Sequence, residues 1–223
     1  MTIDFHAHIL PGCDHGSSGM STTSKQLKAA RESGVDIICA TSHFYPDREN
    51  VEDFLARREK CAARLFSHEG EANSPKILLG AEILACVGLE RIPGLEKLCL
   101  EGTNILLVEM PFNGWQRELV EMMESLSYRK EFRTVLAHAD RYDPMDVERI
   151  LEMGIPIQLN AESLSGLFVK KHIKDWMDRD VVVAIGSDIH GSEDGYKKWD
   201  KARSKLKGRW DEIMERTYSL INT

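Results

Sequence analysis

Two histidines, His6 and His8, stand two residues apart close to the start of the chain. They lie at the end of a predicted β-strand at residues 2–6, and side chains two apart in an extended backbone point to the same side. Two imidazoles placed in this way can bind one divalent metal ion. A similar pair, Asp188 and His190, follows an apolar strand near the other end of the chain. The sequence therefore predicts a metal site whose parts come from both ends.

Strand-like and helix-like runs alternate along the chain. Strands are expected at residues 2–6, 35–41, 76–82, 103–109, 134–137, 156–159 and 181–185, and helices at 21–33, 51–68, 116–130, 144–152, 167–177 and 197–222, the last broken at Gly208. Residues 85–100 fit neither pattern. The alternation predicts an α/β fold with a parallel sheet. An open doubly wound sheet and a closed barrel both agree with it.

Most of the predicted strands end in a histidine or a carboxylate. In chain order these residues are His6, His8, Asp14 and His15 after the first strand, His43 after the second, Glu82, Glu109, His138 with Arg141, and finally Asp188 with His190. Chemistry that gathers at the ends of many strands favours a barrel. A carboxylate that closes an apolar run, such as Glu82 or Glu109, is costly to bury unless it is paired or bound to metal.

Nine of these residues are candidate metal ligands, which is too many for one ion. Imidazole and carboxylate together suit zinc, manganese or iron, so two or three divalent metal ions are expected. Each residue taken singly could instead be an ordinary loop or core residue. Cys13 lies within the same region, either as a thiol ligand or nucleophile or as a small residue that fills space.

Composition narrows the class of protein. The 223 residues, 42% of them hydrophobic, suit a single globular domain over residues 1–223. A formal net charge of -7 argues against nucleic acid or an anionic membrane as the main partner. No apolar run approaches the length of a membrane span. Five cysteines without a C-x-x-C pair indicate reduced thiols and a cytoplasmic location.

The order and spacing of the nine candidate ligands resemble the PHP (polymerase and histidinol phosphatase) superfamily. The matching segments are residues 4–12, 80–83, 107–111, 137–142 and 186–190. Within this superfamily the chain is most similar to the bacterial manganese-dependent tyrosine-protein phosphatases of capsule and exopolysaccharide clusters. The resemblance implies a distorted seven-stranded β/α barrel with three metal ions, manganese being favoured.

The resemblance also implies how the ligands are shared among the ions. One metal takes His6, His8, Glu82 and Asp188; a second shares Glu82 and adds Glu109 and His138; a third takes His15, His43 and His190. The implied substrate is the phosphotyrosine-bearing tail of a bacterial tyrosine kinase.

Several other residues are expected to act in catalysis or substrate binding. Arg141 is expected to clamp a phosphate oxygen, and Asp14 is the nearest general acid, or else caps its own loop. Phe112 and Trp115 either wall the pocket or pack within their loop. The basic segment 197–209 is either a docking surface for a phosphorylated peptide or a solvated helix face.

The chain departs from the tyrosine phosphatase pattern in two places. His15 stands where this branch usually carries aspartate. A second arginine expected after residues 187–190 is absent, and Lys197 or Lys198 is the candidate substitute. This second departure keeps open a phosphatase of small molecules, such as histidinol phosphate or a sugar phosphate.

Two further classes compete with a phosphatase. The first is a non-catalytic, metal-bound regulatory protein, which a loss of ligands would favour. The second is an amidohydrolase-like deacylase, which normally places a lysine where this chain has Glu82 and Glu109. The sequence leaves the oligomeric state open.

Overall fold

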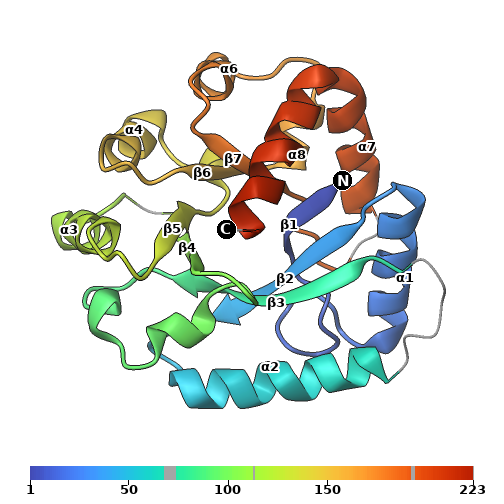
Figure 1. Ribbon diagram of the computed structural model, residues 1–223, viewed down its shortest axis with the longest axis horizontal. Coiled ribbons are helices and arrows are strands. Elements are labelled where there is room, and N and C mark those ends of the chain that lie inside the picture. Colours follow the sequence, from blue (N-terminus) through green and yellow to red (C-terminus); the bar gives the residue numbers. More distant parts are fainter. Residues whose placement is uncertain (68–73, 113, 192–193, 223) are drawn as a thin grey trace.

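Seven parallel strands form the centre of the molecule and follow one another around the sheet in chain order (Figure 1). The computed structural model describes residues 1–67, 74–112, 114–191 and 194–222. The strands are β1 (Ile3–Ala7), β2 (Ile37–Phe44), β3 (Lys76–Leu84), β4 (Ile105–Glu109), β5 (Arg133–Leu136), β6 (Ile157–Asn160) and β7 (Val182–Gly186). The predicted seven strands and their parallel sheet are confirmed.

The first and last strands meet at their carboxyl ends and nearly close the sheet into a barrel. The Asp188 N–H donates to the His6 carbonyl at 2.7 Å, and the His8 N–H donates to the Ile189 carbonyl at 3.3 Å. These bonds join the segments that end the first and follow the last strand at one rim, which confirms the predicted α/β barrel.

Helices surround this barrel on the outside, except the last helix, which runs across the front of the strands and ends near the middle of the ring (Figure 1). They are α1 (Met20–Glu32), α2 (Val51–Phe66), α3 (Arg117–Ser127), α4 (Pro144–Glu152), α5 (Ala161–Ser165), α6 (Lys171–Asp178), α7 (Asp194–Leu206) and α8 (Gly208–Ile221), with 3₁₀ turns η1 (Leu89–Arg91), η2 (Leu95–Leu98) and η3 (Ala139–Arg141). Side-chain caps fix the first turns of α2 and α4. The Asn50 side chain accepts from the Asp53 N–H at 2.9 Å, and the Asp143 side chain accepts from the Met145 N–H at 2.8 Å.

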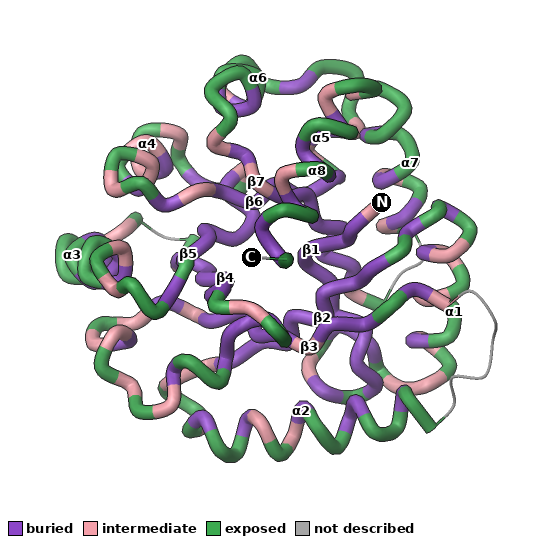
Figure 2. Tube along the Cα trace, in the orientation of Figure 1, coloured by how far each residue is buried: buried purple, intermediate pink, exposed green. Residues whose placement is uncertain are grey.

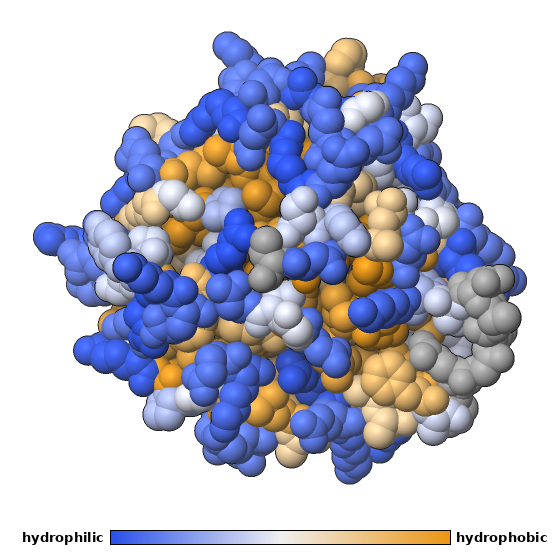
Figure 3. Space-filling model, in the orientation of Figure 1, coloured by the Kyte–Doolittle hydropathy of each residue, from blue (hydrophilic) through white to orange (hydrophobic). Residues whose placement is uncertain are grey.

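Burial follows the same layering. The strands are buried and the outer faces of the helices are exposed (Figure 2). In Figure 3 hydrophilic side chains cover much of the outer ring, and hydrophobic groups show between them. Among the described residues, none of the helices combines the length and the apolar character that crossing a membrane requires.

Where β1 and β7 separate, helix α8 takes the place of a neighbouring strand. The Thr217 hydroxyl donates to the Val183 carbonyl at 2.8 Å, and Arg216 donates to the Val182 carbonyl at 2.8 Å. On the other side, the Ile3 N–H donates to the Met214 sulfur at 3.3 Å. Edge groups that a closed barrel would satisfy with strand bonds are thus satisfied by the helix.

The structure differs from the predicted elements in several places. Strand β2 runs on to Phe44, so His43 lies within the strand rather than after it. Helix α6 begins at Lys171 instead of 167, because Leu167 and Phe168 are almost fully exposed and have no core to pack against. Residues 85–100 contain the two turns η1 and η2. The predicted end of the second helix at residue 68 lies outside the described residues.

Candidate metal centre

Four side-chain atoms, from residues on or directly after β1, β3 and β7, converge at the carboxyl rim of the barrel. The His6 Nε2 and His8 Nε2 atoms lie 3.1 Å apart. Each is 3.2–3.3 Å from Glu82 Oε2 and 3.5–3.7 Å from Asp188 Oδ1. All four residues are buried. We call these four side chains the first ligand group; they are the set implied for the first metal.

The proton state of His8 shows what this group can bind. Its Nδ1 lies 2.9 Å from Asp14 Oδ2, a carboxylate oxygen that can only accept, so Nδ1 carries a proton and Nε2 is the ring atom left for a metal ion. This Nε2 atom faces the carboxylates of Glu82 and Asp188. Carboxylates buried this close together require positive charge among them, and a metal ion can supply it. The spacing of the four ligand atoms is close to the ~3.4 Å edge of a tetrahedron with metal–ligand bonds of about 2.1 Å.

The buried carboxylates around His8 also favour a bound cation. Burial alone would lower the pKa of His8, but hydrogen bonds to Asp14, Asp188 and Glu82 raise it well above its ordinary value. The buried carboxylates thus stabilise positive charge at this position, which a divalent metal ion supplies. The residues fit such an ion.

Glu82 also reaches a second ligand group, formed with His43, Glu109 and His138. The His138 Nε2 atom lies 2.8 Å from Glu82 Oε1 and 3.4 Å from Glu109 Oε1. Burial opposes protonation of His138, but these two carboxylates raise its pKa to about 9. Since Glu82 Oε1 faces His138 while Oε2 faces His6 and His8, this carboxylate can bridge two ions.

Strand register brings His43 beside Glu82, because the two residues are paired across β2 and β3. The His43 Nδ1 atom lies 3.0 Å from Glu82 Oε2 and 3.9 Å from Glu109 Oε2. His43 therefore borders the second ligand group as well as the histidines implied for the third metal.

His8, His43 and His190 form a third cluster, with nitrogen atoms within 4.8 Å of one another. His15 is exposed and stacks on the rings of His43 and His190, with centroids 4.7 and 4.6 Å away. Burial and the neighbouring His8 lower the pKa of His190 to about 4. Burial and His43 lower the pKa of His15. Both rings are therefore neutral at neutral pH, the state that binds metal.

Two residues of this centre have a backbone conformation that side chains other than glycine rarely adopt. His138 has φ 30° and Asp188 has φ 49°. Such residues cost about 1–3 kcal/mol each and persist where the surrounding structure fixes them, often at functional sites.

Asp14 is held by three donors. Its carboxylate accepts from His8 Nδ1, from the Gly16 N–H at 2.9 Å and from the His43 N–H at 3.1 Å. Burial by itself would raise the pKa of Asp14, but these bonds hold it below its ordinary value. The geometry makes Asp14 an anchor for His8 and for its own loop, and its role as a general acid stays a prediction.

Arg141 lies at the rim of the first ligand group. Its Nη2 donates to Asp188 Oδ2, and 39% of the side chain is exposed. The guanidinium is thus next to the ligands and open to solvent. Lys197 instead pairs with Asp194 at 2.6 Å on the surface of α7, and Lys198 pairs with Glu162.

The basic segment 197–209 makes several contacts within the protein. Lys198 and Arg209 pair with Glu162 and Asp178, and Arg203 donates to the Ser33 carbonyl at 3.3 Å. These contacts favour the solvated helix face over a docking surface.

Aromatic rings border the second ligand group. Phe112 is 60% exposed and lies over the His138 ring, with centroids 5.8 Å apart and an interplanar angle of 21°. Trp115 donates to the Pro111 carbonyl and packs edge-on against Tyr142, 5.2 Å away, so it supports the loop.

Several residues at the site were missed by the sequence reasoning. Tyr45 stacks on His43 at 5.2 Å, and Arg57 of α2 donates to the carbonyls of Cys13 and His43. Gln158 and Asn160 of β6 lie among the ligands. The signal for these last two was available, since they interrupt an otherwise apolar strand.

Cys13 is buried, and burial raises the pKa of its thiol to about 12. A protonated thiol is a poor ligand and nucleophile, so the space-filling interpretation holds.

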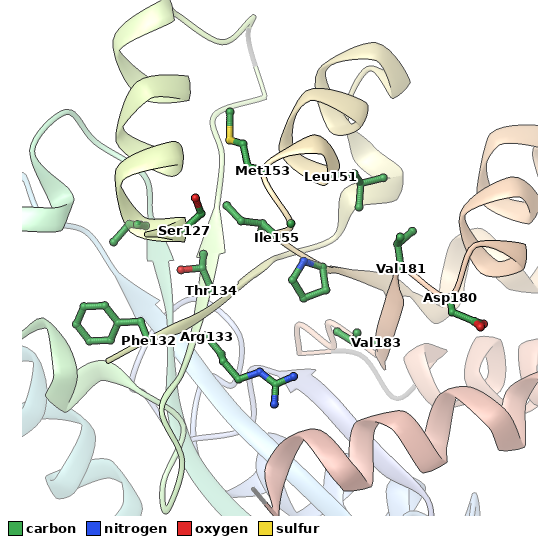
Figure 4. A pocket seen from close by; sticks show the side chains of 13 residues that line it. Ser127, Phe132, Arg133, Thr134, Leu151, Met153, Ile155, Asp180, Val181 and Val183 are labelled. Carbon is green, nitrogen blue, oxygen red and sulfur yellow. The ribbon is translucent and has the colours of Figure 1, made fainter. Parts of the chain in front are cut away.

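A separate cavity of about 430 Å³ lies at the other end of the strands, between β5, β6 and β7 (Figure 4). Leu151, Ile155 and Val181 are among the residues that line it. It contains none of the predicted site residues, so the candidate chemistry belongs to the carboxyl rim.

A seven-stranded α/β barrel with histidines and carboxylates gathered at one rim is typical of metal-dependent hydrolases. Residues 2–223 match the model of the CpsB/CapC family of capsular polysaccharide synthesis, and the chain belongs to this family. The family resemblance predicted from the motifs is confirmed.

Known relatives agree with this assignment. The tyrosine-protein phosphatase CpsB of Streptococcus pneumoniae is 26% identical over 208 residues, covering 84% of this chain and 82% of that protein. A chain from the crystal structures of YwqE from Bacillus subtilis and CpsB from Streptococcus pneumoniae, unique metal-dependent tyrosine phosphatases, superposes with a TM-score of 0.77 at 21% identity, covering 99% and 94% of the two chains.

A more distant fold relative is the histidinol phosphate phosphatase of Lactococcus lactis, crystallised with zinc, L-histidinol and phosphate. It superposes with a TM-score of 0.59 at 15% identity and covers 93% of each chain.

Proposed function

We propose that the protein is a metal-dependent protein-tyrosine phosphatase that acts on a bacterial tyrosine kinase in polysaccharide biosynthesis. The observation that carries this proposal is the convergence of His6, His8, Glu82 and Asp188 on one point beside an exposed arginine. Membership of the CpsB/CapC family and the similarity to the phosphatase CpsB support the same reaction.

We assign the ligands to three sites. The first ligand group holds one ion, Glu82 bridges to a second held with Glu109 and His138, and His15, His43 and His190 hold a third, with manganese the favoured metal. Ions bound there would supply a nucleophile from water at neutral pH and Lewis-acid stabilisation of phosphoryl charge.

The surrounding residues would bind and orient the phosphotyrosine. Arg141 donates to a non-bridging phosphate oxygen and offsets negative charge in the transition state. Phe112 offers an exposed ring on which the tyrosyl ring stacks. In the reaction, water adds to phosphorus, the bond from phosphorus to the tyrosyl oxygen breaks, and tyrosine and phosphate leave.

The test is hydrolysis of a phosphotyrosyl peptide beside a panel of alkyl phosphates, with added manganese and with metal content measured on the same sample. Faster turnover of the peptide is expected, because a phenolate leaves more readily than an alkoxide and the ring can stack. No activity at full metal occupancy would contradict the proposal and favour a non-catalytic protein.

A small phosphate ester is the alternative substrate. The specific observation in its favour is that Lys197 and Lys198, the candidate substitutes for a second arginine, pair with Asp194 and Glu162. Activity restricted to alkyl phosphates would select this alternative.

We further propose that residues 1–223 work as one domain, because the ligands extend from His6 to His190. A reducing, cytoplasmic location is supported by the five free thiols.

A further inference from the structure

Strand β6 carries none of the proposed metal ligands, yet two of its side chains lie among them. Gln158 and Asn160 are buried, with 0% and 2% of their surface exposed. A buried amide is stable only when its donors and acceptors are paired, so the partners of these two residues define what they do.

Backbone groups fix the orientation of the Gln158 amide. The His138 N–H, which can only donate, points at Oε1 from 2.7 Å. The Leu159 carbonyl, which can only accept, lies 2.7 Å from Nε2. Exchanging the oxygen and nitrogen would break both bonds, so Oε1 is the acceptor that the rest of the site meets.

This orientation fixes the tautomer of His6. The His6 Nδ1 atom lies 3.2 Å from the same Oε1 oxygen. A nitrogen facing an acceptor must carry a proton, so in the neutral ring, which is the form that binds metal, the lone pair of His6 is on Nε2. That atom faces His8 Nε2 and the carboxylates of the first ligand group.

The same chain of bonds orients Asp188. Gln158 Nε2 donates to Asn160 Oδ1 at 3.0 Å, which leaves Asn160 Nδ2 to donate to Asp188 Oδ2 at 2.9 Å. Arg141 donates to this oxygen as well. Asp188 Oδ2 is therefore occupied by protein donors, and Oδ1 is the oxygen turned toward His6 and His8.

We infer that Gln158 and Asn160 are positioning residues that set the tautomer of His6 and the orientation of Asp188 for metal binding. The inference rests on the proposed metal site but not on the phosphatase reaction. Gly186 keeps the arrangement tight, because a Cβ there would lie 2.5 Å from His6 Cβ and 2.9 Å from Gln158 Nε2.

The first test compares Gln158→Leu with Gln158→Glu by competition with a metal chelator. Leucine removes the acceptor for His6, and metal affinity is expected to fall about 10- to 100-fold. Glutamate keeps an acceptor oxygen and should retain more affinity than leucine. Pure packing predicts the reverse order, because a buried glutamate costs more than a buried leucine.

Gln26 supplies a matched control. It is a fully buried glutamine on α1 whose amide has no hydrogen-bond partner among the described residues. Gln26→Leu should leave metal affinity unchanged. Thermal melting of each metal-free variant shows whether the fold is kept.

The second test needs no variant. Nitrogen-15 NMR of the zinc-loaded wild-type protein should place the proton of His6 on Nδ1 and the metal on Nε2. Metal on Nδ1 would overturn the inference, even if Gln158→Leu did not fold. A folded Gln158→Leu protein with wild-type metal affinity would overturn it too. Neither readout depends on phosphatase activity, so the two proposals can fail separately.

Discussion

At the scale of single residues, the two oxygens of Asp188 contact different groups, and so do the two oxygens of Glu82. Asp188 gives Oδ2 to Arg141 and Asn160 and turns Oδ1 to the histidines. Glu82 turns Oε2 to His8 and Oε1 to His138. Carboxylates fixed in this way present single oxygens at set positions, which rigid metal binding requires.

Arg141 is expected to act on the substrate and not on the metals. In Arg141→Ala the turnover of phosphate esters should fall about 10²- to 10³-fold, the usual effect of removing one donor to a transition-state oxygen. Metal content should stay unchanged, because Asn160 still holds Asp188 Oδ2.

Arg141→Lys provides the comparison, because it keeps the charge without the bidentate fork and should restore part of the rate. Steady-state kinetics and metal analysis on the same samples decide the matter. Loss of metal in Arg141→Ala would assign the arginine to support of Asp188.

At the scale of secondary structure, register and tethers decide which side chains meet. Parallel pairing sets His43 beside Glu82. Helix α2 then ties the site loop to β2 through Arg57, which donates to the Cys13 carbonyl and, at 3.0 Å, to the His43 carbonyl.

Replacing this tether should cost stability. Arg57→Met is expected to lower the free energy of unfolding by about 1–3 kcal/mol, because two carbonyls and Glu49 lose a charged donor. Chemical denaturation of the metal-free protein measures the change. Lys60→Ala, an exposed position on the same helix, should change stability by less than about 0.5 kcal/mol. Equal effects of the two substitutions would refute the tether.

At the scale of the whole molecule, barrel closure depends on α8. Thr217 is fully buried and donates to the Val183 carbonyl at the open side of β7. Thr217→Val keeps the volume but removes the donor, so unfolding free energy should drop by about 1–2 kcal/mol. Thr217→Ser keeps the hydroxyl and should retain this bond. A denaturation series in which valine is as stable as threonine would contradict the closing role.

Metal removal should also lower the thermal stability of the whole protein. The proposed ligands lie on or directly after six of the seven strands, and without a cation their carboxylates and lone pairs oppose one another. At free metal about 100-fold above the dissociation constant, binding adds about 2.7 kcal/mol. Chelation should therefore lower the melting temperature by roughly 5–10 °C. Restoring the metal must reverse the shift, and a melting temperature unaffected by chelation would argue against sites that span the barrel.

Sequence alone predicted seven strands, a barrel and nine candidate ligands. It could do so because periodicity reports burial, and because the types and spacing of His6, His8, Asp188 and His190 are local properties of the chain. The alternation of strands and helices places all strand ends at one rim, so residues far apart in sequence could be expected to meet.

Only the tertiary structure decided how these residues are supported. Gln158, Asn160 and Arg57 act through hydrogen bonds to groups 14 to 152 residues away, and no local pattern encodes such partners. The free or paired state of Lys197 and Lys198 likewise depends on which acidic groups lie near α7. The residue types alone identify the candidate ligands. The proton positions on the histidines and the orientations of the carboxylates depend on which groups pack against them in the folded protein.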